Sequence, residues 1–169
     1  MIVPPRRPLA LIGFMGCGKS VVGVLVAQRA GAPFHDLDVI IEGEVGMPIS
    51  DFFAVHGEEA FRKHESRLLP AVLQPGAVVA LGGGAPLYGD NWRLINERAV
   101  TVFLDCEFEV LWQRTSGTTN RPLMTGRTRE EVLTLFDERR PRYRQAVHHV
   151  LADRPPDQVA EEIAQLWCG

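Results

Sequence analysis

The stretch "LALIGFMGCGKSVVG", residues 9–23, decides the fold. Apolar residues lead into a glycine-rich turn that ends in Lys19 and Ser20. Gly13 to Ser20 match the pattern G-x-x-x-x-G-K-[ST], in which backbone N–H groups and the start of a helix hold phosphate oxygens. The apolar strand before the turn and the helical pattern after it supply the context that this motif needs. The stretch therefore predicts a phosphate-binding loop but does not say what receives the phosphate.

The composition is that of an ordinary globular protein. The chain has 169 residues, of which 46% are hydrophobic and 23% charged, so we expect one domain that spans residues 1–169 with a core at about 9–167. A net charge of −3 argues against non-specific binding to nucleic acid. No apolar run approaches the roughly 20 residues of a membrane span, and the opening residues do not resemble a signal peptide. A cytoplasmic location is therefore expected.

The cysteines and histidines predict neither a disulfide framework nor a zinc site. The three cysteines are far apart in the sequence and form no C-x-x-C pair. The five histidines include no H-E-x-x-H spacing, and His148 and His149 are adjacent, so on a strand they would point to opposite faces.

Strand-like and helix-like patterns alternate along the chain. We expect strands at 9–13, 33–38, 77–84, 99–105 and 147–153. The expected helices are 20–31, 51–73 with a break near Gly57, 107–115, one that opens at the capping box of Thr128 and Glu131, and 155–167. Such alternation predicts an α/β three-layer sandwich of the phosphate-loop NTPase type, with a five-stranded parallel sheet and helices on both faces.

Three aspartates at predicted strand ends are candidates for the metal and acceptor sites. Asp36 and Asp38 would share one face of a strand, where one could serve Mg²⁺ and the other a substrate hydroxyl. An alternative is that Asp38 caps a helix. Asp105, at the end of a later strand, is a further candidate for the magnesium-binding aspartate of such enzymes.

Three other features have both a functional and an ordinary interpretation. Arg62 and Glu65 can pair on a helix, most often as a surface salt bridge. The glycines at 82–84 indicate either a close backbone approach or a flexible turn. Eight arginines lie between 114 and 144, around a polar, glycine-containing segment. Some of them belong to a solvated face, but the segment at about 115–127 suits a lid over transferring phosphate.

Taken in order, these motifs resemble shikimate kinase, a small phosphate-loop kinase of the nucleoside-monophosphate-kinase type with a five-stranded parallel sheet. The resemblance extends from about residue 9 to about residue 165. It rests on "GFMGCGKS" (13–20), "DLD" (36–38), "FRKHE" (61–65), "GGG" (82–84), "NRPL" (120–123) and "ERRPRYR" (138–144).

On the acceptor side, the resemblance implies that Asp38 binds the shikimate hydroxyls and is the candidate general base. Arg62 and Arg139 would grip the carboxylate, and Glu65, Gly83 and Gly84 would complete the site. Arg140 stands next to Arg139, and the spacing to Pro141 and Tyr143 favours Arg139 for this role.

On the nucleotide side, the resemblance implies that Lys19 handles the phosphates of ATP, that Ser20 and Asp36 hold Mg²⁺, and that Arg121 of the lid contacts both phosphate and substrate. Asp38, Lys19 and Arg121 are thus the expected catalytic residues. The residues implied to bind ATP are Gly16, Cys17, Gly18, Lys19, Ser20, Val21, Arg114, Arg121 and Arg154.

The resemblance implies ATP-dependent phosphorylation of the 3-hydroxyl of shikimate, giving shikimate 3-phosphate and ADP for aromatic amino acid biosynthesis. The partners would be shikimate, ATP and Mg²⁺, with no nucleic acid or membrane, and the chain would act as a monomer. The residues alone indicate only phosphoryl transfer to a small anionic or polyhydroxy acceptor. A kinase of the gluconate type and a non-catalytic nucleotide-binding regulator are the alternatives.

Overall fold

The structure is a computed structural model that describes residues 6–116, 124 and 126–169. Its centre is a parallel sheet in the order β2-β3-β1-β4-β5, which confirms the predicted five-stranded sheet. In β1, every side chain is fully buried, because this strand is central and both its faces are covered. The strands are β1 (Leu9–Ile12), β2 (Phe34–Asp36), β3 (Val78–Ala80), β4 (Val100–Asp105) and β5 (His148–Leu151).

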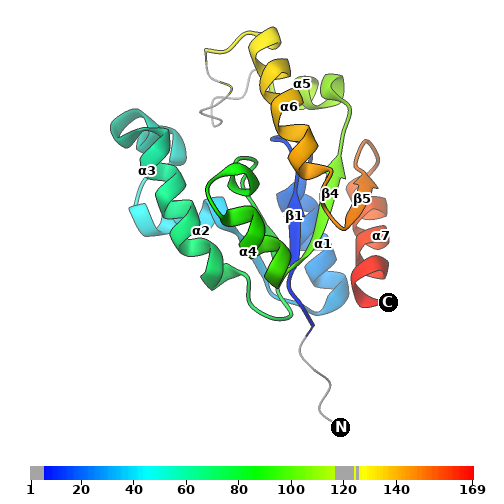
Figure 1. The fold of residues 1–169 in the computed structure, drawn as a ribbon. Coiled ribbons are helices and arrows are strands. Elements are labelled where there is room, and N and C mark those ends of the chain that lie inside the picture. The colour runs from blue at the N-terminus through cyan, green and yellow to red at the C-terminus, as the bar shows by residue number, and fades with distance from the viewer. Residues whose placement is uncertain (1–5, 117–123, 125) are drawn as a thin grey trace.

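Helices cover both faces of the sheet, as predicted (Figure 1). Helices α1 and α7 pack against each other on one face, and α4 and α6 lie on the other. The helix bounds in this part are α1 (Lys19–Ala30), α4 (Asn91–Arg98), α5 (Phe108–Thr115), α6 (Arg129–Tyr143) and α7 (Pro156–Cys168). None of the helices in the described ranges is long and apolar enough to cross a membrane.

Two of the expected helix boundaries are confirmed. Gly31 ends α1 in the left-handed conformation, with φ 61°. The Thr128 hydroxyl accepts from the Glu131 N–H at 3.2 Å, and Glu131 Oε2 accepts from the Thr128 N–H at 2.7 Å. This reciprocal capping box fixes the residue at which α6 begins.

Helices α2 (Leu37–Val45) and α3 (Ile49–Val72) lie beside the β2 edge of the sheet (Figure 1). Helix α3 is interrupted at Gly57, whose φ of 80° and ψ of 170° are not helical, so the predicted break is confirmed. A short 3-10 turn, η1 (Ala85–Leu87), follows the glycines after β3. Helices α2 and α4 were not expected from the sequence.

Candidate active site

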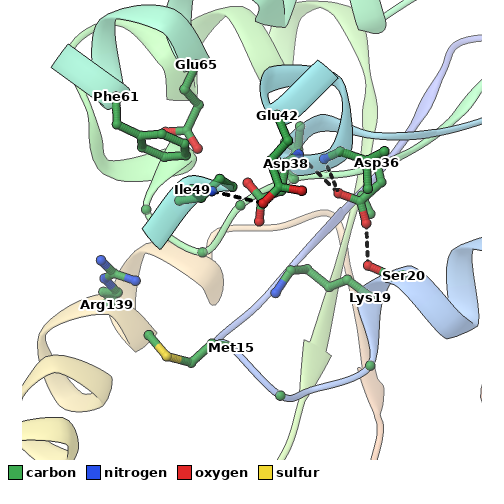
Figure 2. A pocket seen from close by; sticks show the side chains of 18 of the residues that line it. Met15, Lys19, Ser20, Asp36, Asp38, Glu42, Ile49, Phe61, Glu65 and Arg139 are labelled. Carbon is green, nitrogen blue, oxygen red and sulfur yellow. Dashed lines mark hydrogen bonds between the residues drawn. The ribbon is translucent and has the colours of Figure 1, made fainter. Parts of the chain in front are cut away.

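A cavity of about 470 Å³ opens at the carboxyl ends of β1, β2 and β3, where ligands bind in open parallel sheets. The phosphate loop forms one wall, α2 and the two halves of α3 form another, and the glycines at 82–84 line it next to Arg139. Figure 2 shows Asp36, Asp38 and Glu42 above Lys19 and Ser20, with a hydrogen bond between Asp36 and Ser20. The cavity therefore brings the phosphate loop and the predicted acceptor residues together.

The phosphate loop is shaped for an anion before one binds. Gly18 precedes α1 with φ 97° and provides no side-chain cap, so the first N–H groups of the helix remain available to phosphate oxygens. The Lys19 ammonium donates to the carbonyl oxygens of Gly13 at 2.8 Å and Phe14 at 3.1 Å. These bonds hold the lysine within the loop, where its charge faces the cavity.

Asp36 lies where β2 ends and α2 begins, so the prediction that Asp36 and Asp38 share a strand face is wrong. Asp36, rather than Asp38, caps the helix. Its Oδ1 accepts from the N–H groups of Asp38 at 3.0 Å and Val39 at 3.4 Å. The chain changes from strand to helix here because the Asp36 carboxylate accepts from two N–H groups, which in a continued strand would donate to a neighbouring strand.

The other oxygen of Asp36 faces the phosphate loop, where Oδ2 accepts a hydrogen bond from the Ser20 hydroxyl. A hydroxyl and a carboxylate beside a phosphate site are ligands that suit Mg²⁺, which binds few protein groups and completes its shell with phosphate oxygens and water. Among the described residues, no three His, Cys, Asp or Glu side chains cluster to hold a metal. A cation between Ser20 and Asp36 would therefore depend on the phosphates.

Asp38 lies in the first turn of α2, half-buried in the cavity wall. Its burial and the charge of Asp36 raise the pKa of its carboxyl above the ordinary range, while Lys19 and Arg62 act in the opposite direction. A carboxylate in this setting accepts a proton more readily than an exposed aspartate does. Asp38 is thus suited to orient or deprotonate a hydroxyl.

The Arg62–Glu65 pair is buried, so it is not the surface salt bridge that this spacing most often forms. Arg62 Nη1 donates to Glu65 Oε1 at 2.7 Å, and Nη2 donates to Glu58 Oε1 at 3.3 Å. Glu65 is fully buried, and its Oε2 has no hydrogen-bond partner within the described part of the chain. Burial raises the pKa of Glu65 to about 7, although Arg62 opposes this shift.

The glycines at 82–84 provide the close backbone approach that was one of the two interpretations. An added Cβ at the first glycine would lie 2.7 Å from Glu65 Oε2, at the second 3.2 Å from Arg139 Nη1, and at the third 2.2 Å from Arg62 Nη2. The chain has no side chains here because three charged groups occupy that space.

Adjacent arginines on α6 lie in different surroundings. Arg139 is buried and lines the cavity, with its guanidinium 5.9 Å from the centre of the Phe14 ring. Arg140 donates to Asp105 Oδ1 at 3.0 Å and Oδ2 at 3.2 Å. Asp105, paired in this way, does not line the cavity, which leaves Asp36 as the candidate metal ligand. Of the two arginines, Arg139 lines the cavity and Arg140 does not, and the role of Arg139 toward the acceptor stays a prediction.

A second recess, of about 250 Å³, adjoins the outer side of the phosphate loop. Arg114 donates to the carbonyl oxygens of Gly16 at 3.3 Å and Ala152 at 3.4 Å, and Arg154 pairs with Glu162. Most of the residues implied to bind ATP meet here: Gly16, Cys17, Gly18, Val21, Arg114 and Arg154.

Arg121 and the 117–123 part of the expected lid lie outside the described residues, so their roles stay predictions. The sequence analysis missed Glu42 in the cavity wall. Glu42 lies four residues after Asp38, so both side chains share one helix face once α2 is recognised, and this spacing could have indicated it. It also missed the Tyr143 hydroxyl, which donates to the Gly83 carbonyl at 2.6 Å and secures the glycine segment against α6.

Comparison with known proteins gives one family. Residues 15–167 match the family model described as shikimate kinase. A shikimate kinase of Caulobacter vibrioides is 42% identical over 158 residues, which cover 92% of this chain and 79% of that protein. The solved structure of shikimate kinase from Acinetobacter baumannii in complex with shikimate is 32% identical, with a TM-score of 0.91 over 95% of this chain and 92% of that chain.

The alternative acceptor has a weaker parallel. A gluconokinase structure from Sinorhizobium meliloti covers 96% of this chain and 94% of its own, but at 19% identity and a TM-score of 0.57. That likeness shows a shared fold and nothing about the acceptor.

Proposed function

The chain belongs to the shikimate kinase family, and on this premise we propose how its residues transfer the γ-phosphoryl group of ATP to the 3-hydroxyl of shikimate. As a member of this family, the chain is an enzyme that phosphorylates shikimate. The products are shikimate 3-phosphate and ADP. The observation that carries the proposal is a single cavity in which Asp38, Arg62 and Arg139 face a phosphate loop.

Arg62 and Arg139 bind the carboxylate of shikimate. Both are buried and come from different helices, α3 and α6. A planar guanidinium suits a carboxylate because it donates two parallel hydrogen bonds, and burial strengthens the attraction. Glu65 orients Arg62 through the bond at 2.7 Å. The glycines at 82–84 let the ring approach the backbone, since no Cβ stands in front of the two arginines.

Lys19 and the start of α1 bind the phosphates of ATP. The Lys19 ammonium exchanges its bonds to the loop carbonyls for bonds to the β- and γ-phosphates. Asp38 holds the attacking hydroxyl and accepts its proton as the new O–P bond forms and the bond from the γ-phosphorus to the oxygen of the leaving ADP breaks. The lid residue Arg121 remains a proposed contact to the transferring group. Positioning and charge neutralisation supply most of the catalysis in such transfers.

Ser20 and Asp36 fit Mg²⁺, as their facing oxygens indicate. When bound, the ion neutralises charge on the β- and γ-phosphates. We also propose that the chain acts as one kinase domain and as a monomer, with the segment at about 115–127 as its lid, and that it works in the cytoplasm. Sedimentation of the purified chain tests the monomer.

The decisive experiment measures ADP release from Mg²⁺-ATP with shikimate, with gluconate and without an acceptor. Release that depends on shikimate supports the proposal. Release with gluconate alone would overturn shikimate as the acceptor, and ATP binding without any acceptor-dependent release would favour a regulator.

A matched pair of variants tests the assignment of the carboxylate site. Arg139→Lys should raise the shikimate KM by about tenfold or more, because an ammonium cannot replace a bidentate fork. Arg140→Lys should leave that KM within about twofold, since Arg140 pairs with Asp105 away from the cavity. If Arg140→Lys raised the shikimate KM and Arg139→Lys did not, Arg140 rather than Arg139 would bind the carboxylate.

A further inference from the structure

Helix α3 begins without a cap from its own chain segment. The residue before it is Pro48, which forms no side-chain hydrogen bond to the helix. Glu42 of α2 provides that bond instead, because its Oε1 accepts from the N–H of Ile49, the first residue of α3, at 2.9 Å. A carboxylate at a helix start satisfies an otherwise unpaired N–H group and is favoured by the helix dipole.

The first half of α3 faces the cavity. It carries Ile49 and Phe53, two apolar residues of the cavity wall. The second half carries Arg62 and is separated from the first by the non-helical Gly57. Across this break the Phe53 ring packs on the Phe61 ring, with centroids 5.0 Å apart. Glu42 therefore holds the Ile49 end of a segment that Phe61 also contacts.

Glu42 also belongs to the same helix face as Asp38, four residues earlier. Both side chains line the cavity, and Figure 2 shows them close together with Ile49 beside Glu42. Helix α2 therefore carries both Asp38, which faces the acceptor hydroxyl in the proposed function, and Glu42, which contacts the start of α3.

We propose that Glu42 is a positioning residue of the acceptor site, whose carboxylate sets the first turn of α3, with Ile49 and Phe53, relative to Asp38. The inference rests on the proposed function. Glu42 itself contacts neither ATP nor the phosphoryl group in this assignment.

Glu44 offers a matched control on the same helix. Its carboxylate pairs with Arg67 of α3, so it also connects α2 to α3, but it does not line the cavity. Loss of general docking between these helices would affect Glu42 and Glu44 variants alike. Loss of positioning would affect Glu42 variants only.

The experiment compares Glu42→Ala, Glu42→Gln and Glu44→Ala by steady-state kinetics and by titration calorimetry with shikimate. Glu42→Ala should raise the KM and Kd for shikimate about tenfold, while the KM for ATP stays within about twofold. Glu42→Gln should recover most of the loss, because its amide oxygen still accepts from Ile49. Glu44→Ala should leave both KM values within about twofold.

Three results would overturn the inference: an unchanged shikimate Kd in Glu42→Ala, an equal rise of both KM values, or equal effects of Glu42→Ala and Glu44→Ala. The calorimetric arm separates this inference from the proposed function. If the unsubstituted chain binds no shikimate, the proposed function fails, whereas binding that Glu42→Ala leaves unchanged refutes the inference alone.

Discussion

Replacing Glu65 by glutamine should remove a pH dependence of stability that the unsubstituted chain shows between about pH 4.5 and 7. Burial raises the pKa of this carboxyl from its ordinary value of 4.5 to about 7. The folded chain therefore holds the proton more tightly than the unfolded chain does. The resulting stabilisation is fully present below the lower pKa and is lost as the pH rises through the upper one.

The magnitude follows from the two pKa values. At 1.36 kcal/mol for each pH unit, the difference between 4.5 and about 7 corresponds to about 3 kcal/mol of folding free energy. Solvent screens little of it, because Glu65 is fully buried. Glutamine keeps the size of the side chain and an acceptor for Arg62, but it does not titrate.

Urea unfolding, followed by tryptophan fluorescence at several pH values, measures this effect. Between about pH 5 and 8, the free energy of unfolding should fall by about 2–3 kcal/mol more for the unsubstituted chain than for Glu65→Gln. Glu58→Gln, which changes the half-exposed acid on the same arginine, should keep the pH dependence. If the curves for the unsubstituted chain and Glu65→Gln ran parallel, the buried carboxyl would not titrate in this range and the reasoning would be refuted.

Three further predictions concern turnover and acceptor binding. Asp38→Asn should lower kcat by about a hundredfold or more while Kd for ATP stays within about twofold, as measured by initial rates and calorimetry; near-full activity would remove Asp38 from catalysis. Gly84→Ala should weaken shikimate binding about tenfold or more, because the new methyl group would displace the Arg62 guanidinium, whereas Gly43→Ala, with open space around it, should leave the Kd unchanged. Removal of Mg²⁺ by a chelator should abolish ADP release, and calcium should not restore it fully, since Mg²⁺ demands a smaller octahedral shell. Full activity in the presence of the chelator would refute the metal site.

Much of the fold could be predicted from local signals. The phosphate loop, the break at Gly57 and the capping box at Thr128 each depend on a few neighbouring residues whose backbone preferences are strong. Helix α2 was missed because the sequence around Asp36 suits a strand end and a helix start equally well. The hydrogen bonds that Asp36 accepts from two N–H groups favour the helix start over the strand end. These bonds form only in the folded chain.

The identities of the site residues could be predicted from the family motifs. Their burial and contacts in the folded chain could not. The Arg62–Glu65 spacing indicates a pair without indicating its burial, which depends on how α3 packs against the glycines. Glu42 had no motif of its own, because its hydrogen-bond partner at Ile49 belongs to another helix. Contacts between elements that are distant or differently oriented remain hidden until the elements are assembled.

The capping box of α6 has a consequence for how this protein can change in length. Arg139 follows Thr128 by 11 residues (139 − 128), or about three turns of helix, so the cap sets the direction in which the guanidinium points. One residue gained or lost between them would rotate Arg139 by about 100° and bring a neighbour to the cavity. Additions immediately before the cap leave that angle untouched. An insertion between Thr128 and Arg139 should therefore weaken acceptor binding, whereas one immediately before Thr128 should leave the direction of Arg139 unchanged.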